Sequence, residues 1–143
     1  MGSSAMEIRI LRPGDEALLA RAVAMIEEAE LSPAQAAAFL ADPSLVNVVA
    51  LDAGEPVGFV YGYVLKRFEA VSFFIYSVDV EQTHRRRGVA RAMIEALKRE
   101  GRAGRWGEMF VFTNAGNAAA MRLYASAGGV RPPPDDVVMF DFD

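Results

Sequence analysis

Residues 73–90 of this 143-residue chain read Phe73-Phe74-Ile75-Tyr76-Ser77-Val78-Asp79-Val80-Glu81-Gln82-Thr83-His84-Arg85-Arg86-Arg87-Gly88-Val89-Ala90. The aromatic and β-branched residues predict a buried strand, the three arginines a basic loop, and the glycine the start of an amphipathic helix that runs to about residue 100. Backbone N–H groups at a helix start have no partner within the helix, and the helix dipole favours negative charge there. This stretch therefore predicts a binding site for a phosphate group.

The remainder of the sequence predicts further strands and helices on both sides of this stretch. Strand patterns cover residues 7–12, 45–52, 57–66, 109–113 and 137–142, and helical patterns cover residues 15–30, 32–40 and 117–127, with Asp15 and Asn117 as caps and Gly101 ending the central helix. We therefore expect a mixed sheet covered by helices in one layered α/β domain over residues 6–143. Residues 1–5 are interpreted as the remnant of an expression tag.

The composition limits the classes of function. The chain has no cysteine and one histidine, which argues against disulfides, a cysteine nucleophile and a metal site built from these residues. Its net charge is −4, whereas nucleic-acid binding requires a basic surface. It shows neither an apolar run of membrane-spanning length nor a signal-peptide pattern. We expect a cytoplasmic protein without a metal, a nucleic-acid partner or a membrane partner.

The glycine in this loop distinguishes between types of phosphate site. A P-loop requires Gly-x-x-x-x-Gly-Lys-[Ser/Thr] and a dinucleotide fold requires Gly-x-Gly-x-x-Gly after the first strand, and the chain has neither pattern there. Residues 85–90 instead have the form [Gln/Arg]-x-x-Gly-x-[Gly/Ala] after a buried strand. This form resembles the acetyl-coenzyme A signature of the GNAT superfamily of N-acetyltransferases. An ordinary basic loop before a helix is the alternative.

A second GNAT-like signature, Asn-x-x-Ala-x-x-x-Tyr-x-x-x-Gly, is present as Asn117, Ala120, Tyr124 and Gly128. The resemblance implies that Tyr124 protonates the departing thiolate of coenzyme A. A phenol with a pKa near ~10 is a reasonable donor to a thiolate whose conjugate acid has a pKa near ~8.5. The alternative is a tyrosine that serves only in the core. The resemblance also implies a mostly antiparallel, twisted sheet of about six or seven strands flanked by four helices.

The resemblance further implies where acetyl-coenzyme A binds. Its pantetheine arm is expected to pair with the backbone of residues 78–80, between this strand and the strand at 109–113. The backbone amides of residues 86–90 would hold the pyrophosphate, although solvated arginines remain the alternative for the side chains of the loop. The residues assigned to cofactor binding are Val78, Val80, Arg85, Arg86, Arg87, Gly88, Val89, Ala90, Asn117 and Tyr124.

Asp79 is the best candidate for the base or the amine anchor. Strict alternation along the strand places Phe73, Ile75, Ser77 and Asp79 on one face, and Phe74, Tyr76, Val78 and Val80 on the other. A carboxylate on a buried strand is costly unless it has a partner. The alternative is a carboxylate at the strand end that binds loop amides or arginines. Because there is no cysteine, direct transfer to a deprotonated amine is expected.

Over residues 57–143 the sequence is most similar to the small aminoglycoside 3-N-acetyltransferases of the GNAT type, through Tyr63-Val64-Leu65-Lys66-Arg67-Phe68-Glu69, Ile75-Tyr76, His84-Arg85-Arg86 and Val138-Met139-Phe140-Asp141-Phe142-Asp143. In those enzymes an aspartate is expected where Ser77 stands. The resemblance implies a polycationic acceptor, a role in antibiotic resistance and a homodimer. An acidic acceptor site could be formed by Glu69, Asp79, Asp135, Asp136, Asp141 and Asp143 if these side chains converge, and solvated surface carboxylates are the alternative. The substrate-binding candidates are Glu69, Ser77, Asp79 and Asp136.

Two questions about the acceptor stay open. Polyamines or peptide N-termini would be acetylated by the same chemistry, with Asp79, or Glu69 through a water, as base. A non-catalytic acyl-coenzyme A-binding module is a different class of function. Tyr124 favours the enzyme, because a protein that only binds the cofactor needs no acid for a thiolate, whereas Ser77 in place of an aspartate keeps the module possible.

Overall fold

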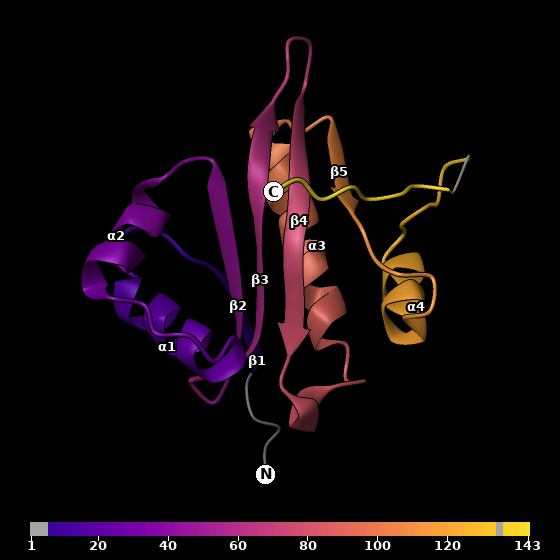
Figure 1. Cartoon of the computed structure of the whole chain (residues 1–143). Coiled ribbons are helices and arrows are strands. Elements are labelled where there is room, and N and C mark those ends of the chain that lie inside the picture. Colours follow the sequence, from indigo (N-terminus) through magenta and orange to yellow (C-terminus); the bar gives the residue numbers. More distant parts are fainter. Residues whose placement is uncertain (1–5, 134–135) are drawn as a thin grey trace. The chain divides into compact units, whose positions relative to one another are not determined.

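The structure is a computed structural model that describes residues 6–133 and 136–143 (Figure 1). The chain forms two compact units, which divide after residue 112 and are described separately. The interpretation of residues 1–5 as a tag remnant lies outside the described residues.

The elements follow the predicted order. The first unit contains β1 (Met6–Ile10), α1 (Glu16–Ile26), α2 (Pro33–Ala41), β2 (Leu45–Asp52), β3 (Glu55–Lys66), β4 (Val71–Val80), a 3₁₀ helix (Gln82–His84), α3 (Val89–Gly104) and β5 (Glu108–Val111), and the second contains α4 (Ala118–Ser126). The strands lie in the order β1-β2-β3-β4-β5. The first four are antiparallel neighbours, and β5 is parallel to β4. The predicted mixed, mostly antiparallel sheet with four helices is confirmed.

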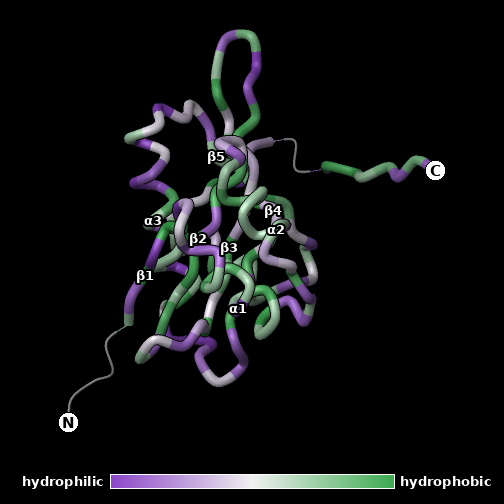
Figure 2. The backbone as a smooth tube through the Cα atoms, turned by 90° about the vertical axis from the view of Figure 1, so that its left-hand side faces the viewer, coloured by the Kyte–Doolittle hydropathy of each residue, from purple (hydrophilic) through white to green (hydrophobic). Residues whose placement is uncertain are grey.

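The expected number of strands is wrong. In the described part of the chain the sheet has five strands, and residues 136–143 have no regular secondary structure. This segment is hydrophobic (Figure 2), yet Phe140 is 79% exposed and Phe142 is 90% exposed. An alternating sequence becomes a strand only where a neighbouring strand takes its backbone hydrogen bonds. The strand predicted at 137–142 is therefore wrong, because no neighbouring strand pairs with this segment in the described residues.

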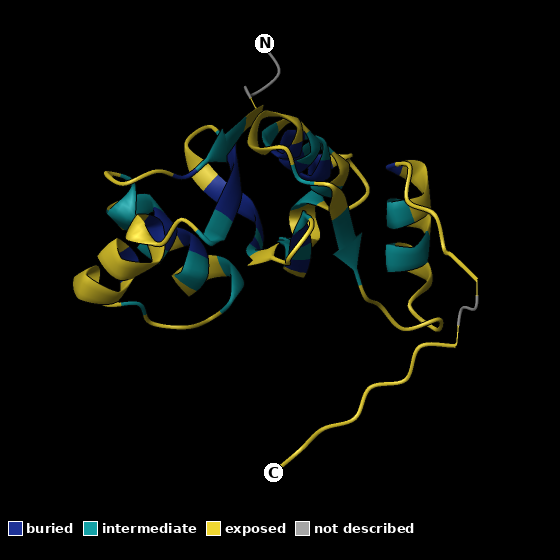
Figure 3. Ribbon diagram, turned by 90° about the horizontal axis from the view of Figure 1, so that it is seen from above, coloured by how far each residue is buried: buried dark blue, intermediate teal, exposed yellow. Residues whose placement is uncertain are grey.

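Helices cover both faces of the sheet in the first unit, and buried residues gather where the helices meet the strands (Figure 3). On one face, Met93 and Leu97 of α3 pack against Val60 and Phe73. Each such buried side chain contributes roughly 1.5–3 kcal/mol through the apolar area it removes from water. On the other face a second core is formed by Leu11, Leu19, Ala22, Ala36, Leu40, Val49, Leu51 and Phe59. β4, which leads into the predicted phosphate loop, therefore lies in a sheet that is packed against helices on both faces.

A β-bulge in β4 changes which side chains face each layer. Tyr61 pairs with Ser77 and Gly62 pairs with Ile75, so Tyr76 is an extra residue without a partner in β3. A bulge of one residue reverses the alternation beyond it. The prediction that Phe73, Ile75, Ser77 and Asp79 share one face is therefore wrong. The first two pack against the α3 core, whereas Asp79 pairs with Phe59 and lies on the α1 side.

The bulge also explains a glycine in β3. A Cβ atom at Gly62 would collide with the backbone oxygen of Phe74 and would lie 2.7 Å from the Cζ atom of Phe73. The same reversal brings Val78 and Val80 into contact with the α3 core. Gly62 is thus required by the close approach of the two strands at the bulge.

The end of α3 differs from the prediction. Gly101 lies within the helix, which continues to Gly104, and Arg105 adopts the left-handed conformation at the C-cap. A Cβ atom at Gly101 would lie 2.7 Å from the ring of Trp106, which stacks on Phe73 with ring centroids 4.2 Å apart. The glycine is therefore explained by tertiary packing and not by helix termination.

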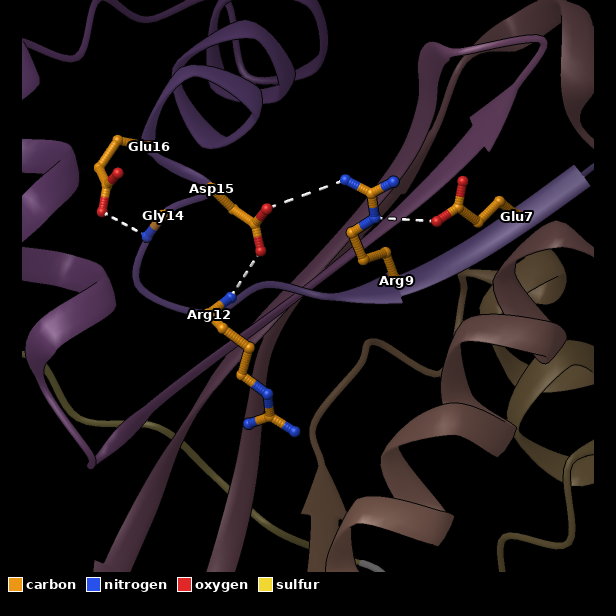
Figure 4. Close-up of polar contacts among 6 residues, drawn as sticks. All are labelled: Glu7, Arg9, Arg12, Gly14, Asp15 and Glu16. Atoms are coloured by element: carbon orange, nitrogen blue, oxygen red, sulfur yellow. Dashed lines mark hydrogen bonds and ion pairs between the residues drawn. The ribbon is translucent and has the colours of Figure 1, made fainter.

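The turn after β1 is held by charged groups (Figure 4). Asp15 occupies the N-cap position of α1, but its side chain makes no capping hydrogen bond and accepts instead from the backbone N–H of Arg12 at 2.8 Å. It also lies 3.8 Å from Nη1 of Arg9. The guanidinium of Arg12 forms two 3.1 Å hydrogen bonds to the carboxylate of Glu100 in α3. The predicted capping by Asp15 is thus replaced by a role in the turn.

The substitution Gly62→Ala is expected to lower the free energy of unfolding by about 3 kcal/mol, because the added methyl has no space at the bulge. Gly107→Ala is the matched control, since a Cβ atom there would meet its nearest neighbour at an ordinary 3.6 Å. Urea unfolding monitored by circular dichroism measures both. Equal losses in the two variants would contradict the role assigned to Gly62.

Candidate functional site

The predicted phosphate loop has the geometry that an anion requires. Gly88 is the N-cap of α3 with φ of +79°, in the left-handed region that favours glycine, and no side chain caps this helix end. A Cβ atom at Gly88 would meet nothing within 4 Å, so the approach to the helix start is open. Uncapped N–H groups at an open helix start can bind a phosphate. The N–H groups of residues 88–91, which precede the first helical hydrogen bond from Ala92 to Gly88, form this donor set.

Side chains from the loop anchor it to the sheet. Nε2 of His84 lies 2.7 Å from Oδ2 of Asp52 at the end of β2, and its Nδ1 lies 2.8 Å from Oγ1 of Thr83. Nε of Arg85 donates to the carbonyl oxygen of Val80 at 3.0 Å. Arg85 thus turns back onto β4, which gives this predicted cofactor residue a structural contact. No sequence pattern predicted the pairing of His84 with Asp52, because 32 residues separate them.

β4 has an open edge next to the phosphate loop. β5 pairs with it only from Ser72 to Ile75, whereas β4 pairs with β3 along its length to Val80. Beyond Ile75, no strand of the first unit's described residues lies against the β5 side of β4. Apart from the Val80 carbonyl oxygen, which accepts from Arg85, the backbone groups of residues 76–80 on that side have no strand partner in the first unit's described residues. An unpaired strand edge can pair with an extended ligand, and the binding of the cofactor at residues 78–80 stays a prediction.

Asp79 belongs to a polar cluster on the α1 side of the sheet. Oγ of Ser77 donates to Oδ2 of Asp79 at 3.0 Å. Glu27, at the C-cap of α1, hydrogen-bonds to Asp79, and Oε1 of Glu27 is shielded from solvent without a hydrogen-bond partner. Burial, then the hydrogen bond and negative charge of Asp79, raise the pKa of Glu27 to about 7, while the Ser77 hydroxyl acts in the opposite direction. Glu27 therefore keeps its proton up to near neutral pH, beside the carboxyl group of Asp79.

Sequence reasoning missed Glu27, although a signal was present. Leu19, Val23 and Glu27 recur at intervals of four residues and share one helix face. Leu19 is 2% exposed and Val23 packs against the same core. A carboxylate that continues a buried stripe is expensive without a partner, which marks it as a candidate.

The other acidic candidate of the first unit, Glu69, is distant from this cluster. It lies exposed in the turn between β3 and β4. The eight residue steps from Val71 to Asp79 span about 26 Å of strand. The structure therefore does not bring Glu69 to Asp79.

Aromatic side chains form a wall beside the carboxyl pair. The ring centroid of Tyr61 lies 5.4 Å from that of Tyr76 and 6.4 Å from that of Tyr63. Burial, and next the negative charge of Glu27, raise the pKa of Tyr61 to about 12, so its phenol stays protonated. Tyr76, the bulged residue, is 60% exposed. Aromatic faces beside a carboxylate suit an amine that also carries a ring.

The second unit contains the second predicted signature. Asn117 caps α4 as predicted, since its Oδ1 accepts from the backbone N–H of Ala120 at 3.0 Å. The N–H of Gly129 donates to the carbonyl oxygen of Tyr124 at 2.8 Å, and a Cβ atom at Gly129 would lie 2.8 Å from that oxygen. Tyr124 is half-buried and Asp136 is exposed. Asp135 lies outside the described residues, so the convergence of acidic groups stays a prediction.

Residues 6–133 and 136–143 contain no group of three or more histidine, cysteine, aspartate or glutamate side chains arranged to hold a metal ion. None of the helices in these ranges combines the length and hydropathy of a membrane span.

Comparison with solved structures finds close matches to this fold. An aminoglycoside acetyltransferase, HMB0005, from an uncultured soil metagenomic sample is 30% identical with a TM-score of 0.87, over 97% of this chain and 98% of its own. The aminoglycoside N-acetyltransferase AAC(6')-Iy is 20% identical with a TM-score of 0.78, over 98% of this chain and 99% of its own. A ribosomal-protein-alanine N-acetyltransferase from Brucella melitensis biovar Abortus 2308 is 21% identical with a TM-score of 0.72, over 96% and 100%. The last two similarities show the fold alone.

Comparison with curated protein sequences finds no match. Comparison with family models matches residues 16–128 to the acetyltransferase (GNAT) family. This match contains both predicted signatures, in residues 85–90 and 117–128. Together with the 30% identity to HMB0005 over nearly the whole chain, it shows that the chain belongs to the GNAT family of acetyltransferases.

Proposed function

We propose that this chain transfers the acetyl group of acetyl-coenzyme A directly to a primary amine, with an aminoglycoside as the acceptor. One observation carries the proposal: the open edge of β4 leads from the carboxyl pair at Asp79 to the uncapped start of α3 at Gly88. A single strand thus connects a place for a phosphate-bearing donor with a place for an amine.

The donor is proposed to bind along this edge. The N–H groups of residues 86–90 take its pyrophosphate, and the dipole of α3 contributes about 0.3–1 kcal/mol per charge. The side chains of Arg86 and Arg87 add charge attraction, which salt weakens. The pantetheine arm pairs with the backbone of residues 78–80 in place of a strand. The thioester then lies on β4, next to the bulge.

The chemistry requires a free amine. An ammonium bound at Asp79 gives one proton to the carboxylate, and its nitrogen attacks the thioester carbonyl to form the C–N bond. The tetrahedral intermediate collapses, the C–S bond breaks, and the thiolate is protonated by the phenol of Tyr124, which regains its proton from the amide nitrogen. The products are an N-acetylated amine, coenzyme A and one proton released from the carboxyl pair.

The acceptor class rests on similarity and on the site. HMB0005 is named an aminoglycoside acetyltransferase, and its 30% identity over nearly the whole chain supports a related acceptor here. The tyrosine wall suits a sugar ring and the carboxyl pair suits an ammonium. Acetylation at the 3-N position follows from the resemblance of residues 57–143 to the 3-N enzymes, and it would confer antibiotic resistance in the cytoplasm. A polyamine or a peptide N-terminus is the alternative acceptor.

Release of coenzyme A from acetyl-coenzyme A tests the proposed function across aminoglycosides, polyamines and peptides. We expect turnover with a deoxystreptamine aminoglycoside, and the position of the acetyl group in the product distinguishes 3-N from 6'-N transfer. Binding of acetyl-coenzyme A without turnover of any amine would contradict the enzyme and favour a binding module.

Gly88→Val is expected to weaken acetyl-coenzyme A binding at least about tenfold, because a side chain there obstructs the approach to the backbone amides. Gly54→Val is the matched control. Gly54 has φ of +84° and a similarly open Cβ position, but it lies in the β2–β3 turn. Both variants place a valine at a positive φ and therefore carry comparable backbone strain. Titration calorimetry measures the affinity of each variant for acetyl-coenzyme A, and the difference between the two affinities reports the loss of the phosphate site. Equal affinities in the two variants would place the phosphate elsewhere.

Tyr124→Phe is expected to reduce kcat about 100-fold while the affinity for acetyl-coenzyme A changes little, because the ring stays and only the acid is lost. Single-turnover kinetics and titration calorimetry measure the two effects. A wild-type kcat in Tyr124→Phe would show that water or another group protonates the thiolate.

A further inference from the structure

Glu27 is the acidic side chain through which α1 reaches β4. It follows the last turn of α1, and its backbone N–H donates to the carbonyl oxygen of Val23 at 3.0 Å. This bond fixes the residue at the point where the helix meets the bulged half of β4. Its Oε1 atom is shielded from water and accepts no hydrogen bond. A shielded carboxyl oxygen without a donor lowers stability, so a purely structural role does not explain it.

Within the described part of the chain, none of the groups that shift the pKa of Glu27 is a cation. The groups that face Glu27 are Asp79 and Ser77 from β4 and Tyr61 from β3, with Tyr63 and Tyr76 behind it. Ser77 donates its hydroxyl to Asp79 at 3.0 Å, which holds that carboxylate in place. Two adjacent carboxyl groups in such surroundings cannot both ionise at ordinary cost. Since none of these groups is a cation, a proton is what can offset the negative charge between Glu27 and Asp79.

We propose that Glu27 is a positioning residue that makes Asp79 an effective base, by sharing with it the proton that the acceptor ammonium gives up. This inference deepens the proposed function and rests on it. The amine loses one proton to the carboxylate pair, becomes the free nucleophile, and the pair keeps that proton in the Glu27–Asp79 hydrogen bond until it passes to water. The net products are the N-acetylated amine, coenzyme A and one proton released to water.

Sharing the proton explains how an aspartate deprotonates an amine near neutral pH. An isolated aspartate with a pKa of ~3.9 is a weak base at that pH. With a pKa raised to about 7, Glu27 holds a proton up to near neutral pH next to Asp79. A base is most effective when its pKa lies near the working pH. The Tyr61 phenol, protonated throughout this range, does not compete for the proton.

The test compares Glu27→Gln with the wild type in the pH dependence of kcat/KM for an aminoglycoside whose reacting amine has a pKa above 9. We expect the wild-type kcat/KM to rise through an inflection near 7 and the variant to lose that inflection. At pH 7.5 the variant should lose at least about tenfold in kcat/KM for the amine. The KM for acetyl-coenzyme A should stay within about twofold, because the phosphate loop is untouched.

Glu28→Gln is the matched control, since Glu28 is the next residue and is exposed. It should keep both the inflection and the rate. An unchanged profile in Glu27→Gln, or the same loss in Glu28→Gln, would overturn the inference.

A second readout needs no amine and separates this inference from the proposed function. In the folded chain Glu27 keeps its proton up to a pH of about 7, whereas the ordinary value is 4.5. The folded state thus binds more protons than the unfolded state between these values, and this group lowers stability as the pH rises through them. The difference in Tm, Glu27→Gln minus wild type, should increase from pH 5 to pH 8. A constant difference would overturn the shared proton, whereas an increase without any amine turnover would contradict only the proposed function.

Discussion

The unpaired residue of β4, Tyr76, determines which side chains of this strand face each layer of the first unit. Before it, Phe73 and Ile75 bury themselves under α3, and beyond it the reversed alternation returns Val78 and Val80 to the same core. The same reversal turns Asp79 toward α1. In an unbroken strand either the valines or the carboxylate would face the wrong layer, so the bulge makes the core and the polar cluster compatible.

The two halves of β4 therefore have different roles in the structure. From Ser72 to Ile75 the strand is paired on both sides, and its side chains fix α3 and Trp106. Beyond Ile75 it is paired on one side, and its free edge, its bulge and the loop that follows it form the candidate site. A rigid half-strand thus positions a half-strand that is open to ligands, which is how precise sites are usually supported.

The carboxyl pair shows a cost of this arrangement. Glu27 continues the apolar stripe of α1 into the sheet, and one of its oxygens lacks a hydrogen-bond donor. An apolar residue there would extend the core formed by Leu19 and Phe59. A destabilising polar group beside the carboxylate of Asp79 is typical of sites where activity opposes stability.

The sequence by itself determined the elements that depend on local interactions. The start of α3 at Gly88, the cap at Asn117 and the order of helices and strands follow from residues a few positions apart, which is why spacing predicted them. Only the tertiary structure decided the bulge opposite Gly62, the reason for Gly101 and the meeting of Glu27 with Asp79. Each depends on a partner distant in the chain, and a shift of one residue in strand pairing reverses the faces without changing the local pattern.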